Sequence, residues 1–113
     1  MGEKRTIAKY RVKPYSLAMT VDLLIDGMMS GTGIRDAING GYVEPADLGL
    51  SRELANDIEH WVGEYGAAHI RGHPVQLVAE LDCAGLAILS RVQDELPMRK
   101  LGYYSDGRLE RLA

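Results

Sequence analysis

The sequence predicts one α+β domain, in which two helices cover one face of a small, mainly antiparallel sheet with a C-terminal β-hairpin. Three observations lead to this fold: amphipathic patterns at 51–65 and 74–96, an alternating pattern at 6–13, and short apolar segments around Asp106-Gly107. The 113 residues suffice for one modest core, and a hydrophobic fraction of 46% is typical of globular domains. We therefore predict a single domain, 1–113, built as a two-layer sandwich.

Two segments near the N-terminus have strand patterns. Apolar and charged residues alternate over 6–13, which favours a half-buried strand that ends at Pro14. Residues 16–26 are compatible with two structures, because their apolar residues repeat with both a two-residue and a helical period. Ser16 as an N-cap and Gly27 as a C-cap favour a helix, whereas the two-residue alternation favours a strand. We favour the strand.

The segment 27–49 predicts a long loop, since it contains six glycines and the turn-forming pair Asn39-Gly40. Within it, 34–38 is compatible with a short helix. A loop of this length is typically functional or mobile. Its Gly31-Thr32-Gly33 lacks the lysine and the strand-to-helix context of a phosphate-binding loop, so we do not expect nucleotide binding.

The second half of the chain predicts two helices. In the first, at 51–65, Ser51 is a suitable N-cap and Gly66 marks the end. The second, at 74–96, has proline in its first turn and stops before another proline. Gly85 lies in its middle and costs about 1 kcal/mol relative to alanine, so we expect it to permit close packing against another element. The apolar stripe of the first helix consists of Leu54, Ile58, Trp61, Val62 and Tyr65.

The C-terminal segment predicts a hairpin. Asp106-Gly107 lies between apolar–polar segments at 99–105 and 108–112, and Asp-Gly is a common two-residue turn between antiparallel strands. We expect these two strands to join the strand at 6–13 in one sheet, with both helices covering one of its faces.

Charge is distributed unevenly along the chain, although the net charge is only −3. Residues 22–95 contain thirteen acidic residues and four arginines, whereas 1–13 contains five basic residues and one glutamate. An acidic surface repels phosphate, which argues against direct nucleic-acid binding, and it attracts a basic partner. The first thirty residues lack a signal-peptide pattern and no stretch has the ~20 apolar residues of a membrane span, so we expect a cytoplasmic protein without membrane contact.

The sequence does not indicate a reaction centre. His69 and His73 lie four residues apart, but Gly72 and Pro74 flank the second, so the two are not expected on one helical face. We therefore predict no metal site and no cofactor. Cys83 lies among apolar residues and is expected to be a buried, unreactive thiol.

Residues 43–105 resemble a layout found in small bacterial proteins. Here the run from Val43 to Leu54 fits a P-x-x-L-x-L-S-x-x-L entry into a helix, and that helix carries Trp61 and Tyr65. A second helix of the form G-x-x-L-x-x-x-[LV]-x-x-E-L then leads into a strand rich in tyrosine. Such proteins are similar in size and acidity to immunity proteins that neutralise a toxin of contact-dependent or polymorphic toxin systems. The residues that fit the second part are Gly85, Leu89 (one place late), Val92, Glu95, Leu96, Tyr103 and Tyr104.

The resemblance and the acidic middle together predict an immunity or inhibitor protein, monomeric or weakly dimeric, that binds a basic toxin domain such as a nuclease. Two alternatives stay open: a structural or oligomeric subunit, and, less favoured, a small enzyme that uses carboxylates or His60 near the 27–49 loop. Four of the predicted binding residues recur at helical spacing along one flank of the first helix. The predicted partner-binding residues are Asp36, Tyr42, Glu44, Asp47, Glu53, Asp57, His60 and Glu64.

Overall fold

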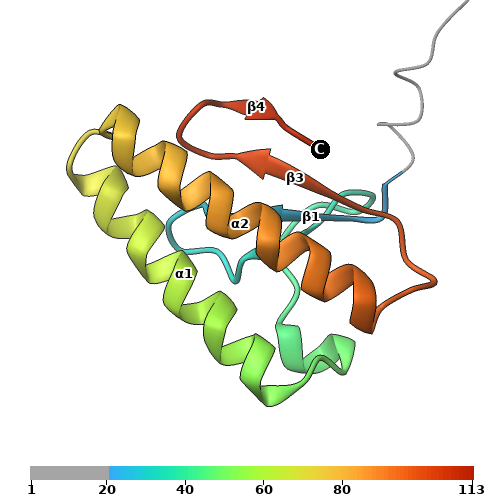
Figure 1. The fold of residues 1–113 in the computed structure, drawn as a ribbon. Helices are drawn as coiled ribbons and strands as arrows, with labels where there is room; N and C mark the ends of the chain where they lie inside the picture. Colours follow the sequence, from blue (N-terminus) through green and yellow to red (C-terminus); the bar gives the residue numbers. More distant parts are fainter. Residues whose placement is uncertain (1–20) are drawn as a thin grey trace, which may run out of the picture.

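The computed structural model describes residues 21–113, which form two layers (Figure 1). Two helices pack on one face of a small mixed sheet of four strands, and two of the three strand pairings are antiparallel. This arrangement confirms the predicted α+β architecture. The strand predicted at 6–13, and the part of 16–26 before residue 21, lie outside the described residues.

The sheet consists of β1 (Leu23–Asp26), β2 (Ile34–Asp36), β3 (Leu101–Ser105) and β4 (Glu110–Arg111), in the order β2-β1-β3-β4. The central strands β1 and β3 run parallel, and each edge strand is antiparallel to its neighbour. The position of β1 confirms the strand interpretation for the described end of 16–26. The short helix considered at 34–38 is wrong, because Ile34 is fully buried and pairs with Ile25 in a β-ladder.

The two helices are α1 (Arg52–Ile70) and α2 (Val75–Glu95), preceded by the short 3₁₀ helix η3 (Pro45–Leu48). Ser51 is the N-cap of α1, as predicted, and its hydroxyl accepts the N–H of Leu54 at 3.3 Å. The prediction that α1 ends at Gly66 is wrong. That glycine is buried beside Met29, the helix continues through it, and α1 ends one turn later with Arg71 as its C-cap.

The turn between β3 and β4 is wider than the predicted two-residue turn. Ser105 pairs with Glu110, which leaves four residues in the loop, and Leu109 has a left-handed backbone with φ of 56°. The N–H of Leu109 donates to the carbonyl of Ser105 at 2.8 Å. Gly107 is required here for space, since a Cβ would lie 2.7 Å from Val78 on α2. The hairpin itself is confirmed.

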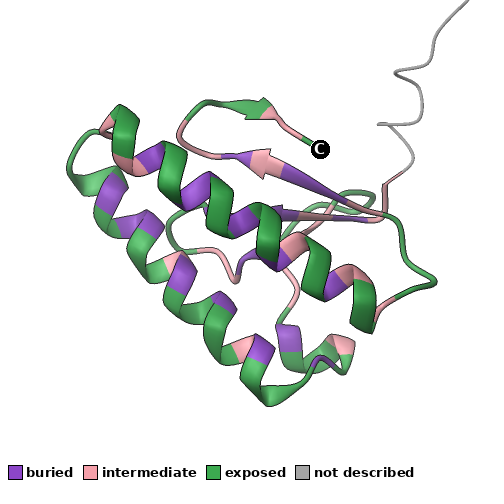
Figure 2. Cartoon of the chain, viewed as in Figure 1, coloured by how far each residue is buried: buried purple, intermediate pink, exposed green. Residues whose placement is uncertain are grey.

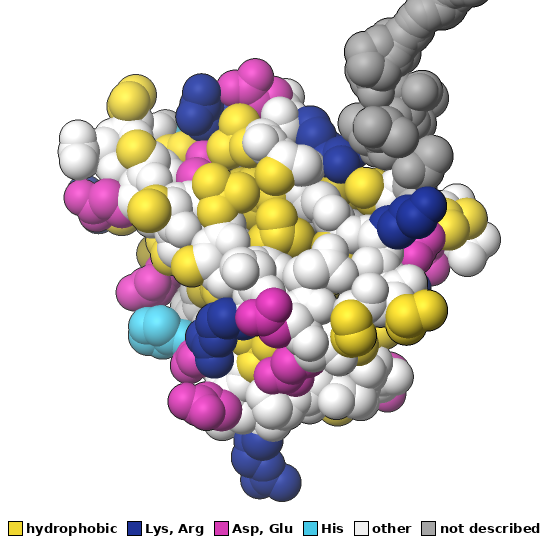
Figure 3. Space-filling view, turned by 45° about the vertical axis from the view of Figure 1, so that its right-hand side comes forward, with side chains coloured by type: hydrophobic (Ala, Val, Ile, Leu, Met, Phe, Trp, Pro, Cys, Tyr) yellow, Lys and Arg dark blue, Asp and Glu magenta, His cyan; other side chains and the backbone are white. Residues whose placement is uncertain are grey.

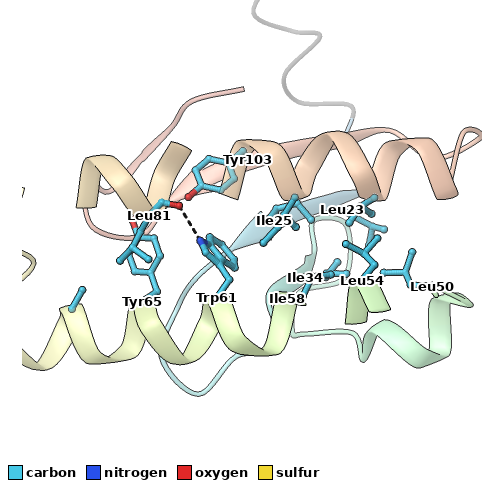
Figure 4. Close-up of a cluster of buried hydrophobic side chains, with 13 residues drawn as sticks. Leu23, Ile25, Ile34, Leu50, Leu54, Ile58, Trp61, Tyr65, Leu81 and Tyr103 are labelled. Atoms are coloured by element: carbon cyan, nitrogen blue, oxygen red, sulfur yellow. Dashed lines mark hydrogen bonds between the residues drawn. The ribbon is translucent and has the colours of Figure 1, made fainter. Parts of the chain in front are cut away.

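The core lies between the sheet and the helices, whose buried residues face one another (Figures 2 and 4). Trp61 is its largest anchor, and its indole N–H donates to the carbonyl of Leu81 at 2.9 Å. Gly85 lies against Tyr103 and Trp61, where a Cβ would collide with both rings. The predicted role of Gly85 in close packing is therefore confirmed.

Candidate functional site

Three predicted binding residues lie along one flank of α1, beside a hollow of about 280 Å³ between the two helices. They are Asp57, His60 and Glu64. Arg91 of α2 donates to Asp57 across this hollow at 2.8 Å, and His60 lies 3.3 Å from the carboxylate of Glu64. On the face drawn in Figure 3, a histidine lies beside a basic side chain, with acidic side chains close to both.

A second hollow of about 330 Å³ shares Glu64 and adds Glu80 of α2. We refer to the two hollows together as the α1–α2 groove. Its rim carries three acidic side chains and one arginine, whereas its lining includes several alanines that leave the helix backbones close to the surface. The groove is lined by Asp57, His60, Trp61, Glu64, Ala67, Leu77, Glu80, Leu81, Ala84, Ala87, Ile88 and Arg91.

The other predicted binding residues are not part of this groove. Glu44 lines a separate hollow of about 270 Å³ with Glu59 and Val62. Asp47 is exposed on η3, and Glu53 is exposed in the first turn of α1. The structure therefore divides the predicted acidic residues among at least two faces of α1.

The segment 27–49 contains β2 and η3 and is not one long loop, and Asp36 and Tyr42 both hold it in place. Asp36 accepts the backbone N–H groups of Ile38 and Asn39, each at 2.9 Å, and these hydrogen bonds lower the pKa of the Asp36 carboxyl. The hydroxyl of Tyr42 donates to Asp26 at 3.3 Å, and burial raises the pKa of Tyr42 to about 12. The side chain of Tyr42 is half-buried and its hydroxyl is engaged, so the structure does not present this predicted binding residue as a freely exposed side chain.

Asp82 on α2 is a carboxylate with only 3% of its surface exposed. Its Oδ1 accepts hydrogen bonds from the hydroxyls of Tyr65 at 2.8 Å and Tyr103 at 2.6 Å, and its Oδ2 accepts one from Ser105 at 2.7 Å. Burial raises the pKa of Tyr65 to about 12 and also raises that of Tyr103, so both hydroxyls stay protonated and can donate. We call these four residues the Asp82 network. It joins α1, α2 and β3.

The Asp82 network also anchors the β3–β4 turn on both sides of Asp106. Ser105 Oγ accepts the backbone N–H of Arg108 at 3.1 Å, and the hydroxyl of Tyr65 accepts that of Gly107 at 3.1 Å. Asp106 is thereby held beside His73, with 3.5 Å between the carboxylate Oδ2 and the imidazole Nε2.

His73 reaches this position because the chain reverses after α1. Gly72 and His73 have left-handed backbones, with φ of 83° and 54°, and the N–H of His73 donates to the carbonyl of Ala68 at 2.8 Å. The reversal brings the ring centroid of His73 to 4.9 Å from that of His69. One ligand atom from each of His69, His73 and Asp106 lies within 4.8 Å of the others.

Two imidazoles and one carboxylate are a ligand set that zinc and related metals accept. The two histidines do not share a helical face, as expected from the sequence, and the reversal of the chain brings them together instead. The Gly72-His73 pair is the local signal of this reversal, because a glycine at the end of a helix commonly starts a left-handed cap that turns the chain back.

Cys83 is exposed on α2, so the prediction of a buried thiol is wrong. Its apolar neighbours in the sequence do not share one environment, because Leu81 faces the core while Ala84 and Leu86 are exposed.

Comparisons of this chain with protein families, curated proteins and solved structures found no match. The resemblance to immunity proteins therefore stays a prediction. Within residues 21–113, none of the helices combines the length and the apolar character needed to cross a membrane.

Proposed function

We propose that this protein is a cytoplasmic immunity or inhibitor protein, which binds and neutralises a toxin domain through the α1–α2 groove. The observation that supports this proposal is the pairing of three acidic side chains with three alanines along one groove. A basic helix or loop of a partner fits such a groove, because small residues permit close approach while Asp57, Glu64 and Glu80 attract cationic side chains.

Charge at this rim acts mainly on recognition. Exposed ion pairs contribute about 0–1 kcal/mol each, so three acidic residues do not supply the affinity of a tight inhibitor. They raise the association rate and disfavour acidic partners, while apolar contacts with the groove lining slow dissociation. Toxin nucleases carry basic residues that hold phosphate, and a basic helix or loop near such a site is complementary in charge to this groove.

The arrangement of the acidic groups favours binding over turnover. Asp57 is paired with Arg91, and Glu64 with His60, at exposed positions on the helix pair. The buried carboxylate Asp82 is enclosed by three hydroxyl groups, which leaves it no access to a substrate.

The test is co-expression with the product of the adjacent gene, followed by measurement of growth rescue and of complex formation. We expect the wild-type chain to rescue growth and to co-purify with that product. The double variant E64K/E80K reverses two charges in the groove and should slow association by at least about tenfold at low salt.

The matched control is E44K/E59K, which makes the same charge change at the hollow on the other side of α1. We expect this control to retain rescue and an association rate within about threefold of wild type. Absence of both rescue and complex with the wild-type chain refutes the function. An equal loss in both double variants refutes the groove as the binding site.

A further inference from the structure

We propose that His69, His73 and Asp106 form a binding site for a divalent transition-metal ion, best matched by Zn²⁺, with two imidazole ligands, one carboxylate ligand and an open fourth position. The proposal is independent of toxin binding. It rests on four features of the described residues: ligand spacing, a buried imidazole nitrogen without a hydrogen bond, anchoring of the ligands, and an adjoining hollow.

The spacing matches tetrahedral coordination. Zinc binds imidazole nitrogen and carboxylate oxygen at about 2.0–2.1 Å, which places two ligand atoms about 3.4 Å apart around the ion. His73 Nε2 and Asp106 Oδ2 are 3.5 Å apart. One ligand atom from each of the three side chains lies within 4.8 Å of the other two, and the side chain of His69 is exposed. A shift of that side chain on the order of 1–2 Å would complete the set.

His73 Nε2 is buried and makes no hydrogen bond to any of residues 21–113. A buried polar atom without a partner costs about 1–3 kcal/mol, and Asp106 lies at the outer limit of hydrogen bonding. A metal ion between the two side chains would satisfy both. His73 also holds a left-handed backbone, a conformation that non-glycine residues adopt at a cost and that often marks a functional position.

Both ends of the cluster are held by the fold. The α1 cap fixes His73 through its N–H bond to Ala68, and the Asp82 network fixes the residues on either side of Asp106. Metal sites depend on this kind of support, since loss of outer-shell contacts typically lowers metal affinity about 10–100-fold.

A hollow of about 270 Å³ adjoins His73 and is lined on its other sides by apolar residues of α2 and by Gly107 and Arg108. In this proposal the hollow beside His73 is the space that would take water or a small anion as the fourth ligand. Arg108 adds a positive charge at its edge, although its guanidinium lies 3.2 Å from Glu110. Three protein ligands and one open position are typical of zinc sites that exchange a ligand.

The test is titration of the full, untagged chain with Zn²⁺, read out with a competing chromophoric chelator. Titration with Co²⁺ gives a second readout, because a tetrahedral site produces visible absorption bands. We expect one ion per chain for the wild type. His69→Ala, Asp106→Asn and His73→Asn should each weaken Zn²⁺ binding by more than about 100-fold, a larger effect than that of outer-shell changes. Asparagine is chosen at position 73 because it tolerates a left-handed backbone.

The matched control is His60→Ala, which removes the remaining histidine of the chain from an exposed position on α1. It should leave Zn²⁺ affinity and the Co²⁺ spectrum unchanged, as should Cys83→Ser. Circular dichroism checks that each variant is folded. Zn²⁺ binding by the wild type that is weaker than millimolar overturns the proposal. A loss of Zn²⁺ affinity on His60→Ala equal to that on His73→Asn also overturns it. So does a thiolate–cobalt absorption band in the wild type that Cys83→Ser removes.

Discussion

Removal of the buried Asp82 carboxylate should produce a large loss of stability. Asp82 accepts three hydrogen bonds of 2.6–2.8 Å, and hydrogen bonds to a charged group contribute about 1.5–3 kcal/mol each. In Asp82→Ala the hydroxyls of Tyr65 and Ser105 can still bond to each other, since they lie 3.3 Å apart, whereas Tyr103 loses its partner. We therefore expect a loss of about 3–5 kcal/mol, below the sum of three bonds.

This loss is measurable by urea denaturation. A domain of this size has a total stability of about 5–15 kcal/mol, so Asp82→Ala should shift the midpoint by about 2 M or leave the chain unfolded. Asp82→Asn retains one carbonyl acceptor and should lose about half as much. The control is Asp94→Asn, an exposed position on the same helix, which should change stability by less than about 0.5 kcal/mol.

A double-mutant cycle tests whether the network acts as a unit. Tyr103→Phe removes one donor, and Asp82→Asn removes part of its acceptor, so the two changes together should cost less than their sum by about 1 kcal/mol or more. A free energy of unfolding for Asp82→Ala within about 1 kcal/mol of the wild-type value, at an unchanged m-value, would refute the stabilising role of the Asp82 network. Strict additivity in the cycle would likewise contradict direct coupling.

Two further predictions concern packing and pH. Gly85→Ala should lower the free energy of unfolding by about 1–3 kcal/mol, because its Cβ would lie 2.7 Å from Trp61. Gly63→Ala has no atom within 4 Å of its Cβ and should raise the free energy of unfolding by about 0.5–1 kcal/mol. Urea denaturation measures both, and a gain at both positions would contradict the packing. Hydrogen bonds from the N–H and the hydroxyl of Ser51 lower the pKa of Glu95 from its ordinary value of 4.5. A carboxyl group whose pKa is lower in the folded than in the unfolded chain stabilises the fold at pH values above its unfolded-state pKa, and this stabilisation is lost as the pH falls through its folded-state pKa. Glu95→Gln should therefore be less stable than wild type at pH 7 and equal to it in acid well below pH 4.5. Stability curves for both chains between pH 2 and 7 check this, and a difference independent of pH would contradict it.

Elements with local signals could be predicted from the sequence, whereas those set by distant contacts could not. The N-cap at Ser51 and the C-terminal hairpin each depend on residues close together in the chain. A glycine in the middle of a helix is a local signal of close packing, although the rings that approach Gly85 come from other elements. The helix continues past Gly66 because burial of the neighbouring Tyr65 and Ala68 outweighs the roughly 1 kcal/mol lost to the weak helix propensity of glycine. At Ile34, burial against the core and pairing with β1 decided in favour of a strand.

The candidate sites follow the same division. The acidic flank of α1 is a matter of helical spacing, so Asp57, His60 and Glu64 could be placed together in advance, but the contribution of Glu80 requires the packing of α2 on α1.

The cluster of His69, His73 and Asp106 depends on a different kind of information. Two left-handed residues return the chain after α1, and the β3–β4 turn is fixed by hydroxyls that converge on Asp82 from other elements. Neither the left-handed pair nor the convergence of hydroxyls on Asp82 produces a helical or strand periodicity that could be recognised in the sequence. The Asp82 network thus has two consequences: it satisfies a buried charge, and it sets the position of Asp106 relative to the histidines. A change such as Ser105→Ala should therefore weaken metal binding as well as stability, although Ser105 provides no ligand atom.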